Sequence, residues 1–561
     1  MRFFIPAFVA VNSFFLFAYG ESITYKVIST PGSNHTMGVV VNGKPYPLQP
    51  SKDIPILHSG SAPSGAYSYA KLDKGNSIVE KEPFERQLDQ NATMTLNEFY
   101  NRTWNTQHIT PLPTLLENLP TMHRIDTELH DNNEIPTIYI SGNQDQINLM
   151  HSNTSLDTKV TVDMHFIKTT KITSLKGIQI SLAGRSSKWM DKLSYGLKIP
   201  KGQDLFGYRR LKLRGLRADP SYIREILCFD MMKSMGLPVS GASYSRVIMN
   251  DTPIGLFLMI EAYKNPWYEN EFNNGKKFKD GRGATYQGIG TVSDLSYFGD
   301  NITKYDGPYK SEEDPDKKGK SQSSGLDKVM SFTKFLSEAP TTTPDAVKVW
   351  NEHIDMESVI RSLVVEIVGG FSDGYLANAD NYFLYDNLKE KRFTYLAADF
   401  DTTIGNTIVK LADQWSGNYS QYPGFSFRPL AQKMIQVPEF KSRFEQLLHN
   451  ASQQLIDPKH TNPRIEDLVK MIRQDVDWDY SLPKMNSKPA IDPSMNPFMQ
   501  AGSLPPPLYM GSIEDLMKRP LFDFDTAVNG PTNHISLPGV KEWFQHQSKA
   551  IQDYFAQHPP Q

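Results

Sequence analysis

Four side chains that could hold a metal ion and a phosphate group lie within about thirty residues of one another. Asp373 and Asn381 fall in a polar loop, and Asp399 and Asp401 follow a β-hairpin predicted over residues 382–398. Carboxylate and carboxamide oxygens are hard ligands that suit Mg²⁺ or Mn²⁺. Their grouping at the tips of one helix–loop–hairpin unit indicates phosphoryl transfer. For any one of them alone a simple turn role is the commoner explanation, because Asp and Asn favour turns.

A helix is expected to lead the chain into this loop. Apolar residues recur with helical spacing over residues 359–368, and a Gly-Gly pair then marks a stop. Protein kinases have the same order of parts, with an Asp base, an Asn metal ligand, a hairpin and then a metal-binding Asp. Because Asp373, Asn381 and Asp399 occur in that order, the set favours the chemical interpretation over the turn interpretation.

The motifs D-x7-N-Y-F-L-Y and A-D-F-D-x-x-I-G resemble those of the CotH kinase family, the spore-coat-type atypical kinases. The resemblance implies that Asp373 is the catalytic Asp, that Asn381 and Asp399 are metal ligands, and that Asp401 is a second carboxylate near the metal. It also implies ATP and Mg²⁺ or Mn²⁺ as cofactors and a protein Ser or Thr hydroxyl as the acceptor. The two residues before Asp399 depart from the family, since Ala-Ala stands where Pro-Trp is usual.

Two stretches extend the resemblance to the phosphate side. The sequence D-K-L-S-Y resembles a family motif and implies that Lys192 contacts phosphate, with Lys198 as a competing candidate. A Gly-Arg-Ser-Ser loop before it could cover phosphates with backbone N–H groups and the hydroxyls of Ser186 and Ser187. The alternatives are a surface lysine and an ordinary Gly-Ser loop.

Two glutamates complete the set that the resemblance implies. Arg224-Glu225 matches a family R-E pair, on a helix expected to open at Asp219-Pro220, and Glu225 would be the partner of Lys192. A solvated helix carboxylate is the alternative. Glu261 ends the strand G-L-F-L-M-I-E, which looks like the family's G-x-Y-x-L-x-E, and the backbone after it would meet the adenine.

The expected fold is α+β, an atypical two-lobed protein-kinase-like fold preceded by a small N-terminal β module. The kinase-like domain is expected over residues 135–555. The expected segments are a signal peptide at 1–20, the β module at 21–85, a linker at 86–134 with a helix near 112–119, a small lobe at 135–262, an exposed, mobile insertion at 263–324 and a large lobe at 325–555.

Composition restricts the partners and favours secretion. A net charge of −3, from 59 basic and 62 acidic residues, gives no electrostatic case for nucleic acid or an anionic membrane. A basic start, an apolar run and small residues before Glu21 predict a signal peptide, and no transmembrane segment is expected in the mature chain. With Cys228 as the single cysteine, internal disulfides are excluded. Glycosylation is expected at the sequons of Asn34, Asn91, Asn101, Asn153, Asn250, Asn301, Asn418 and Asn450.

A second hypothesis comes from another class of function. The kinase-like scaffold could present the loop near residues 300–320, together with the β module, to a cell-surface receptor or wall partner. Similar loops occur in fungal members of the family implicated in host-cell attachment. The chain has no GxGxxG, Walker A, zinc-ligand or Ser-nucleophile motif that would indicate other chemistry. The sequence leaves secreted kinase and surface binding protein both open.

Overall fold

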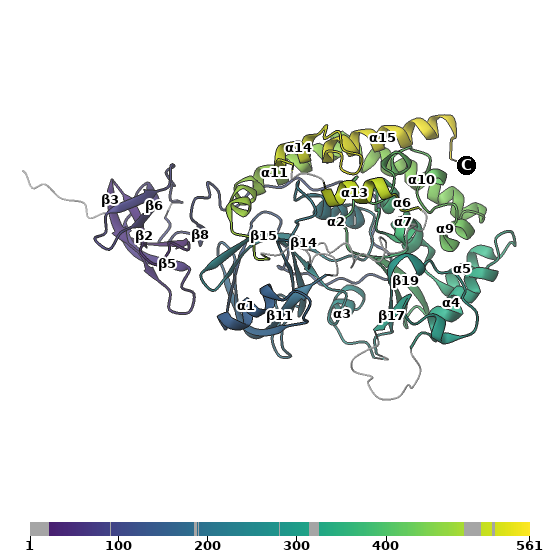
Figure 1. Cartoon of the computed structure of the whole chain (residues 1–561), viewed down its shortest axis with the longest axis horizontal. Coiled ribbons are helices and arrows are strands. Elements are labelled where there is room, and N and C mark those ends of the chain that lie inside the picture. The colour runs from purple at the N-terminus through teal and green to yellow at the C-terminus, as the bar shows by residue number, and fades with distance from the viewer. Residues whose placement is uncertain are drawn as a thin grey trace, which may run out of the picture. The chain divides into compact units, whose positions relative to one another are not determined.

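The computed structural model describes residues 22–89, 91–184, 188, 190–279, 281–312, 325–486, 507–518 and 522–560. The chain divides into two compact units, shown in Figure 1. The first consists of Met1–Asn105 with Ile167–Lys171, and the second of Thr106–Phe166 and Ile172–Gln561. Both units contain sheets, and the second adds many helices, so the fold is mixed α+β. The expected signal peptide lies outside the described residues.

The first unit is built from two four-stranded sheets, in the orders β4-β5-β1-β8 and β3-β2-β6-β7. Apolar and aromatic side chains from both sheets, among them Tyr25, Val39 and Tyr69, form one core. All but one of the strands lie within residues 21–85, where the β module is expected. The strands are β1 (Ser22–Ile28), β2 (Thr36–Val41), β3 (Lys44–Pro47), β4 (Gln49–Pro50), β5 (Leu57–Pro63), β6 (Tyr67–Leu72), β7 (Ile78–Lys81) and β8 (Glu98–Phe99).

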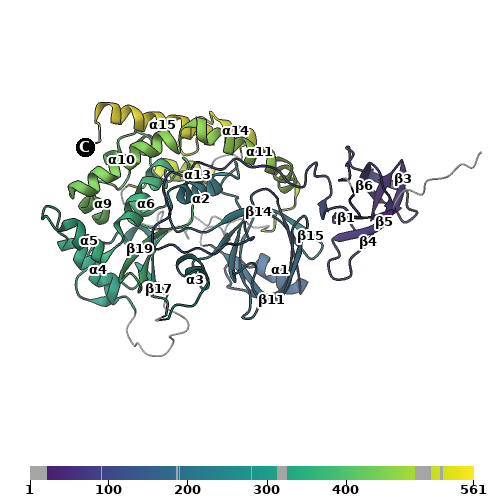
Figure 2. The same ribbon diagram turned by 180° about the vertical axis from the view of Figure 1, so that it is seen from behind.

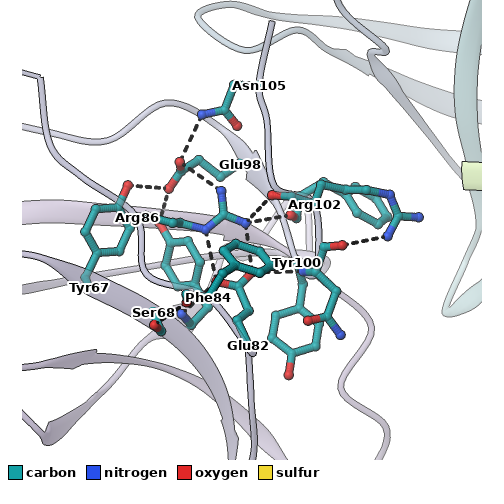
Figure 3. Close-up of polar contacts among 12 residues, drawn as sticks. Tyr67, Ser68, Glu82, Phe84, Arg86, Glu98, Tyr100, Arg102 and Asn105 are labelled. Atoms are coloured by element: carbon teal, nitrogen blue, oxygen red, sulfur yellow. Dashed lines mark hydrogen bonds and ion pairs between the residues drawn. The ribbon is translucent and has the colours of Figure 1, made fainter. Parts of the chain in front are cut away.

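A buried ionic cluster ties the end of this unit to its sheets, as Figure 3 shows. Arg86 donates to both carboxylate oxygens of Glu82, at 3.0 and 2.8 Å, and to Glu98 at 3.2 Å. Tyr67 and Tyr69 donate to the other oxygen of Glu98. Since Glu98 belongs to β8, which pairs with β1, part of the expected linker is built into the first unit.

Seven strands of the second unit close into a barrel, in the order β10-β11-β12-β13-β15-β14-β9. These strands lie within the small lobe expected at residues 135–262. The sequence does not predict that they close into a barrel. They are β9 (Thr137–Gly142), β10 (Lys159–Ile167), β11 (Ile172–Ala183), β12 (Ser194–Lys198), β13 (Arg210–Arg214), β14 (Ala242–Met249) and β15 (Thr252–Glu261).

Helix α2 (Arg224–Ser234) follows β13 and begins later than expected. Its predicted start at Asp219 is wrong, because that carboxylate instead organises the turn before the helix. It accepts from the backbone N–H groups of Ser221 and Arg224, both at 2.9 Å, and from the Arg224 guanidinium. Helix α1 (Gln144–Ser152) lies between β9 and β10 in the chain.

A second sheet carries the hairpin that the sequence predicts beside the candidate site. It has the order β17-β16-β18-β19, with β18 (Tyr382–Asn387) and β19 (Arg392–Ala397) forming the hairpin. The two other strands, β16 (Thr285–Gly288) and β17 (Tyr309–Glu312), come from the segment expected as an exposed insertion. That expectation is wrong for β16 and β17, because they pair in a sheet with β18 and bury aromatic side chains such as that of Tyr286. Residues 313–324 lie outside the described residues.

Helix α6 (Met356–Val368) is buried along nearly its whole length and contacts β19, α2 and α10 (Figure 2). Its end at Val368, before the Gly-Gly pair, confirms the prediction. No helix in the described ranges is both long and apolar enough to span a membrane. The other helices are α3 (Trp267–Phe272), α4 (Asp327–Glu338), α5 (Ala346–His353), α7 (Tyr375–Asn378), α8 (Leu411–Gln414), α9 (Pro429–Met434), α10 (Pro438–Gln454), α11 (Pro458–Ser481), α13 (Met510–Lys518), α14 (Phe524–Asn529) and α15 (Val540–Gln557).

Residues 106–130 form an extended segment of the second unit, which we call the strap. The helix expected near residues 112–119 does not form. Backbone N–H groups in this stretch are used by other elements instead, since Leu115 and Leu116 donate to the carbonyl of Ser234 and Leu119 donates to that of Gly236. The strap is therefore hydrogen-bonded to the end of α2 and is more than a connecting linker.

Candidate active site

The loop that carries Asp373 is held in an uncommon backbone conformation. Gly370, at its start, has a φ of 59°, and a Cβ there would lie 2.5 Å from the ring of Trp543. After α7, Ala379 and Asn381 also adopt left-handed φ values of 52° and 54°. Non-glycine residues take such values at an energetic cost, and they cluster at functional sites.

The side chain of Asn381 connects this loop to the hairpin. Its Nδ2 donates to the Asp373 carboxylate at 2.9 Å and to the Asp373 backbone carbonyl at 3.0 Å. Asn378 donates to the other carboxylate oxygen. Burial, together with the negative charge of Asp380, raises the pKa of Asp373 to about 8. Asp373 and Asn381, which the sequence predicts at one site, are thus in direct contact.

Asp399 and Asp401 share one cation. The Nη2 of Arg214 lies 2.5 Å from Asp399 Oδ1 and 3.1 Å from Asp401 Oδ2. The Nε of the same guanidinium lies 3.0 Å from Glu225 Oε1. Both aspartates are among the charges that raise the pKa of Asp373, so the three carboxylates lie close enough to repel one another. Each of the two aspartates is about one-third exposed, whereas Arg214 is buried.

The turn between the two aspartates is anchored by its aromatic residue. Phe400 is fully buried and its ring lies 4.9 Å from that of Phe229 on α2 and 5.0 Å from that of Phe371. Asp399 itself has a φ of 61°. Packing of the Phe400 ring therefore holds Asp399 in a backbone conformation that a free chain would rarely adopt.

The cleft beside these residues has a volume of about 150 Å³. Its walls come from β13, from the connector after β15, from β16 and β17, and from the hairpin of β18 and β19. They include Lys212, Arg214, Glu261, Ala262, Tyr263, Lys264, Thr285, Gln287, Lys310, Glu312, Asn381 and Asp399. The segment expected to meet the adenine thus lines the same cleft as Asn381 and Asp399, two of the expected metal ligands.

The predicted partnership of Lys192 with Glu225 is wrong. Lys192 is 5% exposed, and its Nζ donates to Asp479 of α11 and to the carbonyl of Leu256. Glu225 pairs with Arg214 instead. Lys192 precedes β12 and lies against α11, so its charge is used inside the protein.

Two of the cations that line the cleft come from β13, and neither was predicted from the sequence. Lys212 and Arg214 are two residues apart on one strand, so their side chains share the face toward Asp399. The alternation L-K-L-R directly before a helix carrying Glu225 is the signal that could have found them. Lys198, the competing candidate, is exposed and is not among the residues that line the cleft.

The remaining predicted residues fall into three groups. The side chain of Glu261 is fully buried and accepts from Arg124 and Trp267, although Glu261 is among the residues that line the cleft. Ser186 and Ser187 lie outside the described residues. Of the sequon asparagines, those exposed are Asn34, Asn91, Asn153, Asn301 and Asn450, and those partly buried are Asn101, Asn250 and Asn418.

The oxygen donors at the cleft are too few to hold a metal ion by themselves. Within the described residues, no three His, Cys, Asp or Glu side chains stand together as a self-sufficient metal site. Asp399, Asp401 and the amide oxygen of Asn381 offer fewer donors than a protein cage would need. Mg²⁺, however, usually keeps several waters and is held by one or two carboxylates together with substrate phosphates. The residues therefore fit an ion that is held jointly with a phosphate.

A family model described as CotH kinase protein matches residues 180–488, more than half of the chain. The chain belongs to this family. Spore coat protein homolog 1 of Rhizopus delemar is 26% identical to it over 471 residues, which are 83% of this chain and 74% of that protein. Invasin CotH7 of the same organism is 27% identical over 480 residues, 83% and 75% of the two chains. Inner spore coat protein H of Bacillus subtilis is 23% identical over 304 residues, 53% and 78% of the two chains.

Proposed function

We propose that this CotH family member is a kinase that transfers the γ-phosphoryl group of ATP to a Ser or Thr hydroxyl of a protein. The observation that carries the proposal is that Asn381 and Asp399 line one cleft with two cations of β13, while Asn381 is hydrogen-bonded to Asp373. Phosphoryl transfer requires mainly positioning and charge stabilisation, and these residue types supply both. The two-lobed kinase-like organisation, with the barrel as the small lobe and the helices as the large lobe, is part of the same proposal.

Each residue has a distinct task in this proposal. Asp373 accepts the proton of the acceptor hydroxyl or orients that hydroxyl, and Asn381 fixes its carboxylate. A Mg²⁺ or Mn²⁺ ion held by Asp399, Asp401 and Asn381 would neutralise charge on the phosphate oxygens. Arg214, placed by Glu225, and Lys212 supply further positive charge beside the phosphates.

Transfer of label from γ-labelled ATP tests the proposal. We expect the full-length chain with Mg²⁺ or Mn²⁺ to label itself or a Ser-rich protein, and Asp373→Asn to lose at least about 100-fold of that rate. Asp413→Asn, at an exposed position on α8, is the matched control and should label like the wild type. A wild type that is folded but neither binds ATP nor transfers label would refute the kinase proposal, as would full activity in Asp373→Asn.

A second candidate, binding at a cell surface, is favoured by the names of the Rhizopus delemar relatives, two of which are Invasin CotH7 and Invasin CotH3. We propose a secreted or surface location, at a spore coat or cell wall, for either function. Binding of the full chain to host or wall surfaces should then persist in Asp373→Asn if the scaffold alone is recognised. Loss of binding in that variant would show that surface binding depends on catalysis.

A further inference from the structure

The strap, residues 106–130, is docked along both the helical part and the barrel side of the second unit. Near its start, the backbone N–H and the hydroxyl of Thr110 donate to Asp467 of α11, at 2.8 and 2.6 Å. Further on, the carbonyl of Glu117 accepts from Arg361 of α6 at 2.8 Å. Near its end, the N–H of Ile125 donates to the carbonyl of Asn270 on α3 at 2.9 Å. The strap therefore contacts both the helical part and the barrel side of the second unit.

Two glycines show how closely the strap is packed. A Cβ on Gly236, whose φ is 64°, would lie 2.1 Å from the carbonyl oxygen of Glu117. A Cβ on Gly241 would lie 2.2 Å from the ring of His130. Side chains at these positions are incompatible with the observed path of the strap, so its placement is built into the unit.

Arg124 is the cation that the strap contributes. Its guanidinium donates to Glu261 at 2.8 Å, to Glu271 at 3.0 Å and to the carbonyl of Val239 at 2.6 Å. Both glutamate side chains are fully buried. Burial by itself would raise the pKa of Glu261, but Arg124 and His130 bring that pKa down to about 2. Glu261 is thus a buried charge that depends on the strap for its counter-charge.

Glu261 is linked in turn to the hairpin of β18 and β19. It ends β15, and the connector that follows, residues 262–264, lines the cleft. Its second carboxylate oxygen accepts from Trp267 Nε1 at 2.9 Å, and the Trp267 ring packs on Tyr263 with the centroids 4.3 Å apart. The Tyr263 hydroxyl donates to the carbonyl of Ala397 at 2.8 Å, two residues before Asp399.

We propose that Arg124 is a positioning residue for nucleotide binding, which fixes the connector at residues 262–264 against the hairpin of β18 and β19 through Glu261 and Trp267. The proposal rests on the kinase function proposed above. Arg124 lies outside residues 180–488, which the family model matches, so the functional unit of this chain extends toward its N-terminus beyond the matched part. Since Arg124 does not line the cleft, it acts on the nucleotide only through the connector.

Arg124→Lys tests the proposal in the full-length chain, because lysine keeps the charge but cannot donate to two carboxylates in a fork. We expect the KM for ATP to rise about tenfold while kcat changes by less than about twofold. Glu261→Gln removes the same link from the other side with little change of shape and should give the same split. Arg473→Lys is the control, since Arg473 donates to both oxygens of one carboxylate, that of Asp525, at an exposed position and should change neither constant.

Amide hydrogen exchange gives a readout that needs no nucleotide. Arg124→Lys should speed exchange in residues 262–268 about tenfold or more, without changing exchange in β12. Unchanged exchange in the connector would overturn the positioning role. A fall in kcat at constant KM would overturn the role in nucleotide binding. A wild type that binds no ATP, with faster connector exchange in the variant, would refute the kinase function while supporting the contact between strap and connector.

Discussion

Lys192 and Lys212 lie in different surroundings, and we expect substitution of each by methionine to affect stability in one case and phosphoryl transfer in the other. Lys192 is buried against Asp479, whereas Lys212 lines the cleft, where Asp399 stabilises its charge against the effect of burial. Methionine keeps most of the side-chain volume in both cases and removes the charge. The matched pair of variants therefore asks which lysine supports the fold and which supports phosphoryl transfer.

Removing the charge of Lys192 leaves the carboxylate of Asp479 buried. Breaking a buried ion pair costs about 3–5 kcal/mol. Because Tyr222 and the N–H of Leu256 still donate to Asp479, at 2.7 and 2.8 Å, we expect the lower end, about 3 kcal/mol. At about 2 °C per kcal/mol, Tm should fall by about 6 °C. The double variant Lys192→Met/Asp479→Asn removes the orphaned charge and should regain most of that loss.

Phosphoryl transfer should show the reverse order of effects. With rates corrected for the folded fraction, Lys192→Met should stay within about threefold of the wild type, while Lys212→Met should lose about 100-fold, as removal of one charge-stabilising donor does elsewhere. Thermal unfolding and labelling from ATP on the same preparations give both quantities. A stable Lys192→Met that has lost transfer, beside an active Lys212→Met, would refute this assignment.

Three further predictions concern stability. Gly255→Ala should lower the stability of the second unit by at least about 3 kcal/mol, measured by thermal unfolding, because φ is 113° and the new Cβ would lie 1.8 Å from Asp479. Burial, only partly offset by a backbone hydrogen bond, lowers the pKa of His58 to about 4. The unfolded chain therefore binds more protons between pH 6.5 and 4, so the first unit should lose about 3 kcal/mol as pH falls through this window, and pulse proteolysis should find that loss absent in His58→Gln. Arg86→Met removes the cation that two buried glutamates share and should destabilise the first unit by about 3–5 kcal/mol in urea, whereas an unchanged midpoint would show that those glutamates are protonated.

Local sequence patterns correctly predicted the helix before Asp373 and the hairpin that follows it. Helical spacing before a Gly-Gly stop, and two β-type segments around a polar turn, place Asp373, Asn381 and Asp399 on the elements that the structure contains. Their convergence follows because all three lie on one continuous stretch of chain, so little tertiary information is needed. The chemical roles of these residues stay predictions until catalysis is measured.

The sequence-based predictions failed where residues far apart in the chain pair with one another. Lys192 is neutralised by Asp479, a residue 287 positions away, and no local motif marks that partner. The strands β16 and β17 read as a polar insertion because only their pairing with β18 and burial of residues such as Tyr286 make them part of a sheet. The strap resembles a linker in sequence for the same reason. The hydrogen-bond partners of the strap described above all come later in the chain.

That order has a consequence for biosynthesis. Thr110 is bonded to Asp467, a residue 357 positions further along. At synthesis rates of about 5–20 residues per second, roughly 20–70 s separate the appearance of the strap from that of its last docking surface. The earliest part of the second unit is therefore among the last to reach its final place. Substitutions that weaken strap docking should then reduce the yield of folded chain during expression before they lower the Tm of the chain that has folded.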